Sequence, residues 1–321
     1  MRVVLALGGN ALLRRGQPAD AETQRANVAA AAAAIAAVAR AGHEIVVTHG
    51  NGPQVGLLAL QSASYHDVAP YPLDVLGAES EGMIGYLLEQ GLRNAGLTAP
   101  VATLLTQVRV DPADPAFAAP SKPIGPVYES AEGSLLAVER GWALAPDGAG
   151  VRRVVASPEP RAILEIDTIR LLVDAGVVVV CAGGGGIPVT VDDAGRIAGV
   201  EAVVDKDLAA ALLAAQLDAD ALVLLTDVAA VIEGFGTDAQ RPLAALDAAA
   251  ARDLHLAAGS MGPKVEAAAR FAARTGGRAA IGAMGDAAAL VAGTAGTQIT
   301  ARAADRARGF PQSIGGDGRM A

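Results

Sequence analysis

VVLALGGN, residues 3–10, is a continuous apolar run that ends abruptly at two glycines and an asparagine. A short apolar run bounded by turn residues is typical of a strand buried on both faces of a parallel sheet. Two further strand-like runs, over 44–48 and 177–181, also end close to glycine clusters, which are Gly50-Asn51-Gly52 and Gly183–Gly186. Helical patterns alternate with these runs and with two later strand-like runs, over 221–225 and 278–281. The helices are expected over 21–41, 73–95, 162–175, 206–217 and 264–275. This alternation predicts an α/β fold with a mainly parallel sheet covered by helices.

The composition excludes several classes of protein. Of the 321 residues, 52% are hydrophobic and 18% are charged, which is not typical of a disordered chain. The net charge of −9 argues against a partner such as nucleic acid or an anionic membrane, because binding to either depends on clustered Lys and Arg. The single cysteine, Cys181, lies in an apolar run and is expected to be a small buried residue in a reducing compartment. No segment has a targeting or membrane-spanning pattern, so we expect a cytoplasmic protein.

The stretch from Asp111 to Pro160 interrupts the alternation. It contains several proline-bounded groups and little periodicity outside residues 132–140. A long stretch of this kind is usually functional or a small subdomain. We therefore expect it to protrude from the sheet and to move as a lid about its two ends, with Lys122 on a tip stiffened by prolines. The main domain is expected to span residues 1–301, followed by a flexible, glycine-rich tail over 302–321.

The glycine clusters indicate an anion-binding site. Each follows an expected strand, and open parallel sheets bind ligands at the carboxyl ends of their strands. Glycine lets backbone N–H groups approach phosphate oxygens closely. A single cluster is equally well explained as an ordinary turn between strand and helix, but three at matching positions favour a phosphate site. The chain contains neither G-x-x-x-x-G-K-[ST] nor G-x-G-x-x-G, which argues against a Walker-type NTPase and a classical dinucleotide fold.

Lysine usage gives a second indication. Most basic residues are arginines, yet the few lysines lie in motif-like segments, several of them bounded by glycine and proline: PSKPIGP around Lys122, VDKD around Lys206 and GSMGPK ending at Lys264. A compact ammonium group suits a phosphoryl group, and phosphoryl transfer requires positioning and charge neutralisation above all. Surface lysines in solvated loops are the alternative interpretation. His49, beside the second glycine cluster, is expected to be a structural hydrogen-bonding residue rather than a catalyst.

Several segments together resemble the carbamate kinases of the amino-acid-kinase superfamily. These segments are LALGGNA (5–11), THGNGPQVG (48–56), KPIGP (122–126), GGGGIPV (183–189) and GVEAVVDKD (199–207), extended by LTDV (225–228) and GSMGPK (259–264). The match runs in order from about residue 2 to about residue 300. One departure is Ala229, which stands where many relatives continue with an aspartate.

The resemblance implies a fold, a reaction and its partners. The fold would be a three-layer α/β/α sandwich, the amino-acid-kinase fold, with a small protruding subdomain. The reaction would be reversible phosphoryl transfer between ATP and carbamate, which gives ADP and carbamoyl phosphate. Mg²⁺ would be bound through the phosphates of ATP or ADP and not by a dedicated set of protein ligands. The resemblance also implies a homodimer and a role in arginine or related nitrogen catabolism.

The resemblance assigns roles to individual residues as well. Asp207 would orient the lysines that clamp the phosphates and the transferring group. The catalytic residues would be Lys122, Lys206, Asp207 and Lys264. The substrate and phosphate site would be lined by Gly8, Gly9, Asn10, Gly50, Asn51, Gly52, Gly183 and Gly184. The nucleotide would be bound by Thr226, Asp227 and Val228.

Two alternatives stay open. One is another kinase of the same superfamily that phosphorylates an acylated amino acid or a nucleoside monophosphate, which would need a roomier acceptor pocket. The other is a catalytically silent regulator that binds a nucleotide. Such a regulator would be expected to lack one of Lys122, Lys206 or Lys264, and all three are present.

Overall fold

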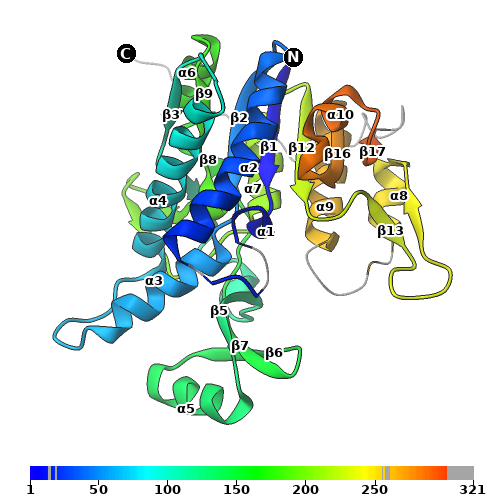
Figure 1. Cartoon of the computed structure of the whole chain (residues 1–321). Helices are drawn as coiled ribbons and strands as arrows, with labels where there is room; N and C mark the ends of the chain where they lie inside the picture. Colours follow the sequence, from blue (N-terminus) through cyan, green and yellow to red (C-terminus); the bar gives the residue numbers. More distant parts are fainter. Residues whose placement is uncertain (14–15, 19, 255, 257–260, 302–321) are drawn as a thin grey trace.

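The computed structural model describes residues 1–13, 16–18, 20–254, 256 and 261–301. Within this part of the chain, one large sheet lies between two layers of helices (Figure 1). Neighbouring strands of the sheet are parallel except for the antiparallel pair β16 and β17, so the predicted mainly parallel sheet is confirmed. In spatial order the strands are β15 (Ala245–Asp247), β17 (Thr297–Thr300), β16 (Arg278–Ala283), β12 (Ala221–Thr226), β1 (Arg2–Leu7), β2 (Glu44–His49), β9 (Val178–Val180) and β3 (Val101–Thr103).

The central strand β1 explains the three layers. Successive strand side chains point to opposite faces of a sheet. Leu5 therefore packs with one layer of helices, and Val4 and Ala6 pack with the other. Both faces are covered, which explains why the strand is an uninterrupted apolar run. The first layer contains α2 (Ala21–Arg40), α4 (Leu73–Asn94) and α10 (Ala287–Ala292), and the second contains α6 (Ile166–Asp174), α7 (Lys206–Gln216), α8 (Ala248–Asp253) and α9 (Met261–Thr275).

Within the stretch 111–160, residues 122–155 form a small subdomain that projects from the body of the molecule (Figure 1). Phe117 and Glu159, near the two ends of the stretch, pack on the body. The strands of the subdomain form an antiparallel sheet, and one helix packs against them. These strands show little periodicity in the sequence because they are short and contain Pro123, Pro126 and Pro146. The elements are β5 (Lys122–Tyr128), α5 (Ser130–Arg140), β6 (Ala143–Asp147) and β7 (Gly150–Val155), preceded by a 3₁₀ turn at Pro115–Phe117.

A second, smaller sheet and a hairpin complete the fold. The second sheet has the order β11 (Ile197–Gly199), β10 (Ile187–Val191), β4 (Gln107–Arg109) and β8 (Ala162–Ile163), and the hairpin pairs β13 (Val231–Glu233) with β14 (Arg241–Leu243). The strand β8 corrects the helix expected over 162–175, which begins only at Ile166. Ala162 and Ile163 instead pair with β4, so the chain is extended there.

The other predicted elements need smaller corrections. Helix α9 begins at Met261, three residues before the expected start, with Pro263 in its first turn. Proline is tolerated there because the first N–H groups of a helix have no partner within the helix. None of the described helices has the length and hydropathy needed to cross a membrane. The predicted tail over 302–321 and residues 259–260 of the GSMGPK segment lie outside the described residues.

Candidate active site

Adjacent strands of the sheet end at one edge and bring the glycine clusters together. Gly8 follows β1, Gly50 follows β2 and Gly183 follows β9 after two residues. The N–H of Gly8 donates to the carbonyl of Leu225 at 3.0 Å, and the N–H of Gly50 donates to the carbonyl of Leu7 at 3.0 Å. The strand order β12, β1, β2, β9 makes these ends neighbours. This is the edge at which open parallel sheets bind ligands.

The chain segments at this edge are too close for larger residues. A Cβ atom on Gly50 would lie 2.9 Å from the backbone nitrogen of Gly9. Gly184 has a positive φ of 67°, and a Cβ atom there would lie 2.1 Å from the Asn51 side-chain amide. The helices α1 (Gly9–Leu12) and α3 (Gly52–Ser64) begin at the first two clusters. Both clusters therefore put helix N-termini at the edge, which favours anions.

Each of the first two glycine clusters contains an asparagine. Asn10 lies in α1, and its side chain is outside the described part of the structure. The Asn51 side-chain amide is buried and donates to the hydroxyl of Ser80 at 2.8 Å. This hydrogen bond connects the start of α3 to α4, so it fixes the second glycine cluster against the helix layer.

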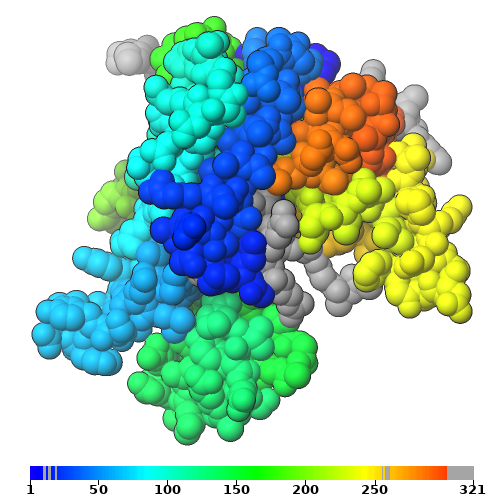
Figure 2. Space-filling model, in the orientation of Figure 1, coloured from blue at the N-terminus to red at the C-terminus, as the bar shows by residue number. Residues whose placement is uncertain are grey.

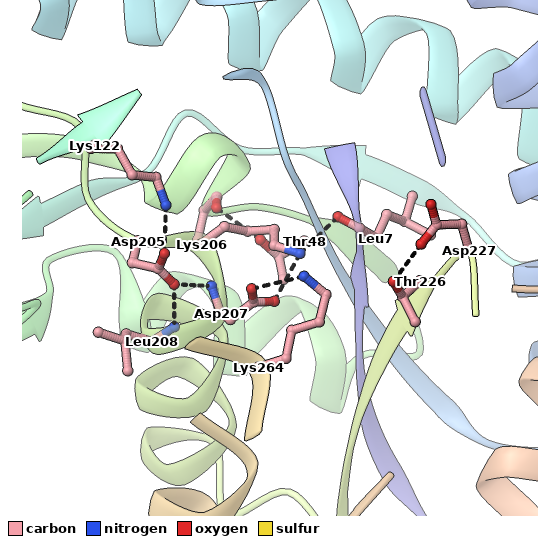
Figure 3. A network of polar contacts seen from close by, with 11 residues as sticks. Leu7, Thr48, Lys122, Asp205, Lys206, Asp207, Leu208, Thr226, Asp227 and Lys264 are labelled. Atoms are coloured by element: carbon pink, nitrogen blue, oxygen red, sulfur yellow. Dashed lines mark hydrogen bonds and ion pairs between the residues drawn. The ribbon is translucent and has the colours of Figure 1, made fainter. Parts of the chain in front are cut away.

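Lys206, Asp207 and Lys264 form a buried charged cluster beside Leu7, the last residue of β1 (Figure 3). The Asp207 carboxylate lies between the two ammonium groups, 2.8 Å from Lys206 Nζ and 3.2 Å from Lys264 Nζ. Lys206 Nζ also donates to the carbonyl of Leu7 at 3.1 Å, which ties the cluster to the end of β1. Only 8%, 4% and 5% of the surfaces of Lys206, Asp207 and Lys264 are exposed. The geometry is therefore that of one carboxylate holding two lysines at the glycine-lined edge.

The charges of this cluster do not balance. Burial lowers the pKa of Lys206, and the neighbouring Lys264 lowers it further, while Asp207 opposes both effects. Burial alone would raise the pKa of Asp207, but the two lysines outweigh it and lower that pKa. The carboxylate is thus ionised and faces two cations. A buried surplus of positive charge is complementary to phosphate oxygens.

Lys122 joins the site from the subdomain, but not from its tip. It is the first residue of β5 and pairs with Val155, where the chain returns to the body. Its Nζ lies 2.5 Å from Asp205 Oδ2, next to the buried lysines (Figure 3). The expectation of a lysine at the tip was wrong, because β5 runs outward from Lys122 and the tip is formed further along the chain. Lys122, Lys206 and Lys264 are all the lysines of the chain, and each contacts Asp205 or Asp207.

The base of the subdomain packs firmly on the body. Ile124 and Val155 of the subdomain are buried with Val55 of α3 in an apolar cluster. Gly56 of α3 faces Gly125 of β5 so closely that a Cβ atom on Gly56 would lie 2.1 Å from Gly125 Cα. The sequence did not predict these contacts, since they join residues 69 to 100 positions apart in the chain. They fix the strand that carries Lys122 relative to α3.

Asp205, which precedes Lys206 in the VDKD segment, also contacts the site, although no role was expected for it. It is the N-cap of α7, and its Oδ1 accepts from the N–H groups of Asp207 at 2.9 Å and Leu208 at 3.2 Å. Its Oδ2 holds Lys122. An aspartate directly before a helical pattern is the available sequence signal, because this residue type is preferred at N-caps. One carboxylate thus sets the start of α7 and the position of Lys122.

The two tasks of Asp205 can be separated by substitution. Asp205→Asn retains a capping oxygen and removes the charge that holds Lys122, whereas Asp205→Ala removes both. We expect the alanine variant to be less stable than the asparagine variant by about 1 kcal/mol, the usual effect of a lost N-cap. Urea unfolding measures this difference. Both variants should lower kcat, since both release Lys122. Equal stability of the two variants would contradict the capping role.

Glu81 and His49 support the third glycine cluster from below. A Cβ atom on Gly183 would lie 2.4 Å from the His49 ring and 3.1 Å from Glu81 Cγ, so both side chains press on this glycine. Burial lowers the pKa of His49 to about 4, and its Nδ1 lies 3.2 Å from the carbonyl of Gly50. Burial raises the pKa of Glu81 well above its usual range, although the N–H of Thr106 donates to Oε2 at 2.9 Å. A neutral His49 at pH 7 fits the expected structural role. No sequence signal marks Glu81, which lies inside a helical pattern.

The raised pKa of Glu81 predicts a pH-dependent stability. The folded chain keeps this carboxyl protonated at pH values above 4.5, where the carboxyl of the unfolded chain ionises. Folding therefore takes up a proton, and the free energy of unfolding falls as the pH rises above 4.5 towards the raised pKa. Glu81→Gln removes this loss. We expect the Tm of Glu81→Gln relative to the wild type to increase between about pH 5 and about pH 8. A Tm difference that does not change with pH would exclude a protonated Glu81.

The predicted nucleotide segment lies on the other side of the cluster from Lys122. Thr226 ends β12, and its hydroxyl donates to Asp227 Oδ1 at 3.1 Å (Figure 3). Val228 follows and is half-buried. The segment adjoins the first glycine cluster, because Gly8 bonds to Leu225. The site thus extends from Lys122 across the two buried lysines to the end of β12.

Comparison with known proteins identifies the family. The family model described as "Amino acid kinase family" matches residues 1–282. The chain belongs to the amino acid kinase family. A carbamate kinase of Haemophilus influenzae is 54% identical over 301 residues, which are 94% of this chain and 97% of that protein. The predicted resemblance to carbamate kinases is confirmed.

Solved structures of this family agree. Carbamate kinase from Giardia lamblia bound to citric acid has a TM-score of 0.88 at 42% identity, and the match covers 94% of this chain and 98% of that one. The Giardia lamblia enzyme bound to AMP-PNP has a TM-score of 0.85 at 41% identity, with coverage of 94% and 98%. The predicted amino-acid-kinase fold is therefore confirmed.

Proposed function

We propose that this protein is a carbamate kinase, which transfers a phosphoryl group reversibly between ATP and carbamate and gives ADP and carbamoyl phosphate. The observation that carries this proposal is the buried cluster of Lys206, Asp207 and Lys264 at an edge lined by three glycine clusters. It supplies surplus positive charge and backbone donors in one place. Relatives named carbamate kinase, up to 54% identical over most of the chain, support the acceptor.

The chemistry requires charge neutralisation more than a base. A carbamate oxygen is already anionic, so it can form the new bond to phosphorus while the bond from phosphorus to the ADP oxygen breaks. The difficulty is to bring two anions together, because at about 4 Å and an effective dielectric constant of about 20 two unit charges repel by ~4 kcal/mol. Lys206 and Lys264 would offset this repulsion and the charge of the transferring group.

The remaining site residues would bind and orient the substrates. The backbone N–H groups of Gly9, Asn10, Asn51 and Gly52 would face the transferring phosphoryl group and the carbamate, with Gly183 and Gly184 beside them. Gly8 and Gly50 would line the same site, while their own N–H groups donate to the carbonyls of Leu225 and Leu7. Lys122 would contact the same group from the subdomain. Thr226, Asp227 and Val228 would hold the nucleotide, and the Giardia lamblia relative was solved bound to AMP-PNP.

Mg²⁺ fits this donor set through the nucleotide. Each Asp207 oxygen faces a lysine ammonium group, Oδ1 that of Lys206 and Oδ2 that of Lys264, so the carboxylate is ion-paired although Oδ1 accepts no hydrogen bond from the described residues. We infer that Mg²⁺ is held by phosphate oxygens of ATP or ADP and supplies further charge neutralisation there. The lysines and glycine N–H groups would then hold the phosphates that the ion does not cover.

The domain organisation, oligomeric state, location and metabolic role are also proposed from the family resemblance. Residues 1–301 would form the catalytic domain, with the subdomain near residues 111–160 as a part of it. The enzyme would be a cytoplasmic homodimer that serves arginine or related nitrogen catabolism. Sedimentation velocity of the purified chain tests the dimer.

The acceptor is tested by a coupled assay of ATP formation. We expect ADP and carbamoyl phosphate to give ATP, and we expect no phosphorylation of N-acetylglutamate, aspartate or UMP above background. An acceptor site lined by glycine backbone would leave little room for these larger acceptors. A higher kcat/KM for any of them would replace the carbamate assignment with another activity of the same family.

A further inference from the structure

A cavity lined by none of the three lysines lies between the subdomain and the body. Its volume is about 570 Å³, which is within the range of about 300–1,000 Å³ that is usual for small-molecule sites. The subdomain contributes Arg140, Trp142 and Arg153, and the body contributes residues of α3, of α4 and of the segment that joins them. In Figure 2 the light-blue α3 region and the green subdomain diverge around a hollow.

The cationic side of this cavity has one unsatisfied donor. The guanidinium groups of Arg140 and Arg153 both lie over the Trp142 ring, 5.1 Å and 4.8 Å from its centroid. Arg153 is paired with Glu201 at 3.2 Å. Nη1 of Arg140 is shielded from solvent and has no hydrogen-bond acceptor among the described residues. A buried guanidinium nitrogen without an acceptor is costly. The Arg140 side chain also lines the cavity, so a rotation of its guanidinium would bring an N–H to an oxyanion bound there, which is its strongest partner.

The acidic residues of the cavity limit the charge of a ligand. Glu201 is engaged twice, since it pairs with Arg153 and its Oε2 accepts from the N–H of Leu73 at 2.8 Å. Glu139 also lines the cavity and is exposed. His66 is the remaining titratable group there besides Tyr65 and Tyr71. Two arginines against two glutamates favour a single anionic group over a polyanion such as a nucleoside triphosphate.

The rest of the wall is largely apolar and aromatic. It is formed by Ala59, Ala63, Tyr65, Tyr71, Leu73 and Leu76 among others. Such a wall accommodates a hydrophobic or planar body, while polar groups fix its orientation. We propose that this cavity is a second binding site, for a small molecule that carries one carboxylate or phosphate group on an apolar or aromatic body. The anionic group binds Arg140, and the body packs against Tyr65, Tyr71 and Trp142.

A molecule bound in this cavity contacts both the subdomain and the body. Arg140 and Trp142 belong to the subdomain, whereas Leu73 and Leu76 belong to α4. A bound molecule therefore bridges the two parts and holds β5, with Lys122 at its start, against the body. Binding itself does not depend on the reaction proposed for the lysine site.

The chain provides its own reporter, because Trp142 is its single tryptophan. Benzoate and phenyl phosphate are the probes, and benzyl alcohol is the uncharged control. We expect saturable changes in Trp142 fluorescence with at least one anion and no saturation with benzyl alcohol. A response to benzoate alone or to phenyl phosphate alone supports the site and identifies its anionic group. No saturable response to either anion would overturn the proposal.

Three variants locate the binding. Arg140→Met keeps the aliphatic stem and should weaken binding at least about tenfold, as expected for a lost charge-assisted hydrogen bond. Ala63→Phe fills the cavity from α3 and should abolish binding, whereas Gln61→Phe adds the same ring at an exposed position of that helix and should not. Lys206→Ala should leave the titration unchanged. Binding that is lost in Lys206→Ala, or that survives in both Arg140→Met and Ala63→Phe, would show that the probes bind elsewhere.

Discussion

Replacing either Lys206 or Lys264 with alanine is expected to lower kcat by about 10²-fold or more. Loss of one pre-placed donor typically removes ~3 kcal/mol of transition-state stabilisation. The chain should stay folded, because Asp207 lies between two lysines and keeps one of them in each variant. Steady-state assays of ATP formation measure kcat, and circular dichroism with thermal melting checks the fold.

The matched control is a variant that removes a positive charge outside the site. The side chain of Arg196 is 82% exposed and pairs with Asp192 on the surface. Arg196→Ala should therefore leave kcat unchanged. Near-normal kcat in folded Lys206→Ala and Lys264→Ala would refute the assignment of the clamp.

The second large effect is expected from Gly56→Ala. The new Cβ would lie 2.1 Å from Gly125 Cα and 2.3 Å from Gly125 N, and backbone atoms cannot move aside as a flexible side chain can. Strand β5 must therefore shift, and Lys122 with it. A displacement of about 1 Å in a reacting site can reduce the rate about 10²-fold, so we expect a loss of that size in kcat together with a lower Tm.

Gly82→Ala is the control for a helical glycine. Apart from its chain neighbours and the backbone of its own helix α4, no described atom lies within 4 Å of the Cβ position at Gly82. This variant should keep its activity and gain up to about 1 kcal/mol of stability from the better helix propensity of alanine. If Gly56→Ala were as active as Gly82→Ala, the contact between α3 and β5 would not position Lys122.

The sequence predicted the glycine clusters at the edge of the sheet better than the position of Lys122, which belongs to the subdomain. The carboxyl ends of neighbouring parallel strands must meet, so Gly8, Gly50 and Gly183 could be placed together from periodicity alone. Lys122 could not be placed in this way. Its position depends on its pairing with Val155, 33 residues away, and on an ion pair with Asp205.

Other features have no local signal at all. Glu81 occupies a helix position that the pattern treats as ordinary, and its protonation follows from burial under Gly183. The cavity between the subdomain and the body combines residues of α3, α4 and the subdomain, whose relative positions are set by tertiary packing. Helix patterns and glycine spacing describe segments, whereas these features arise between segments.

The concentration of all lysines at one site has a practical consequence for handling the protein. Lys206 and Lys264 are buried, and Lys122 is 31% exposed in its side chain. Apart from the α-amino group, the surface therefore offers amine-reactive reagents one side chain, and that side chain belongs to the proposed catalytic residues. Coupling to an activated-ester resin, dye labelling through amines or aldehyde fixation should attach the molecule by its amino end or inactivate it, so such preparations are better made through an introduced cysteine.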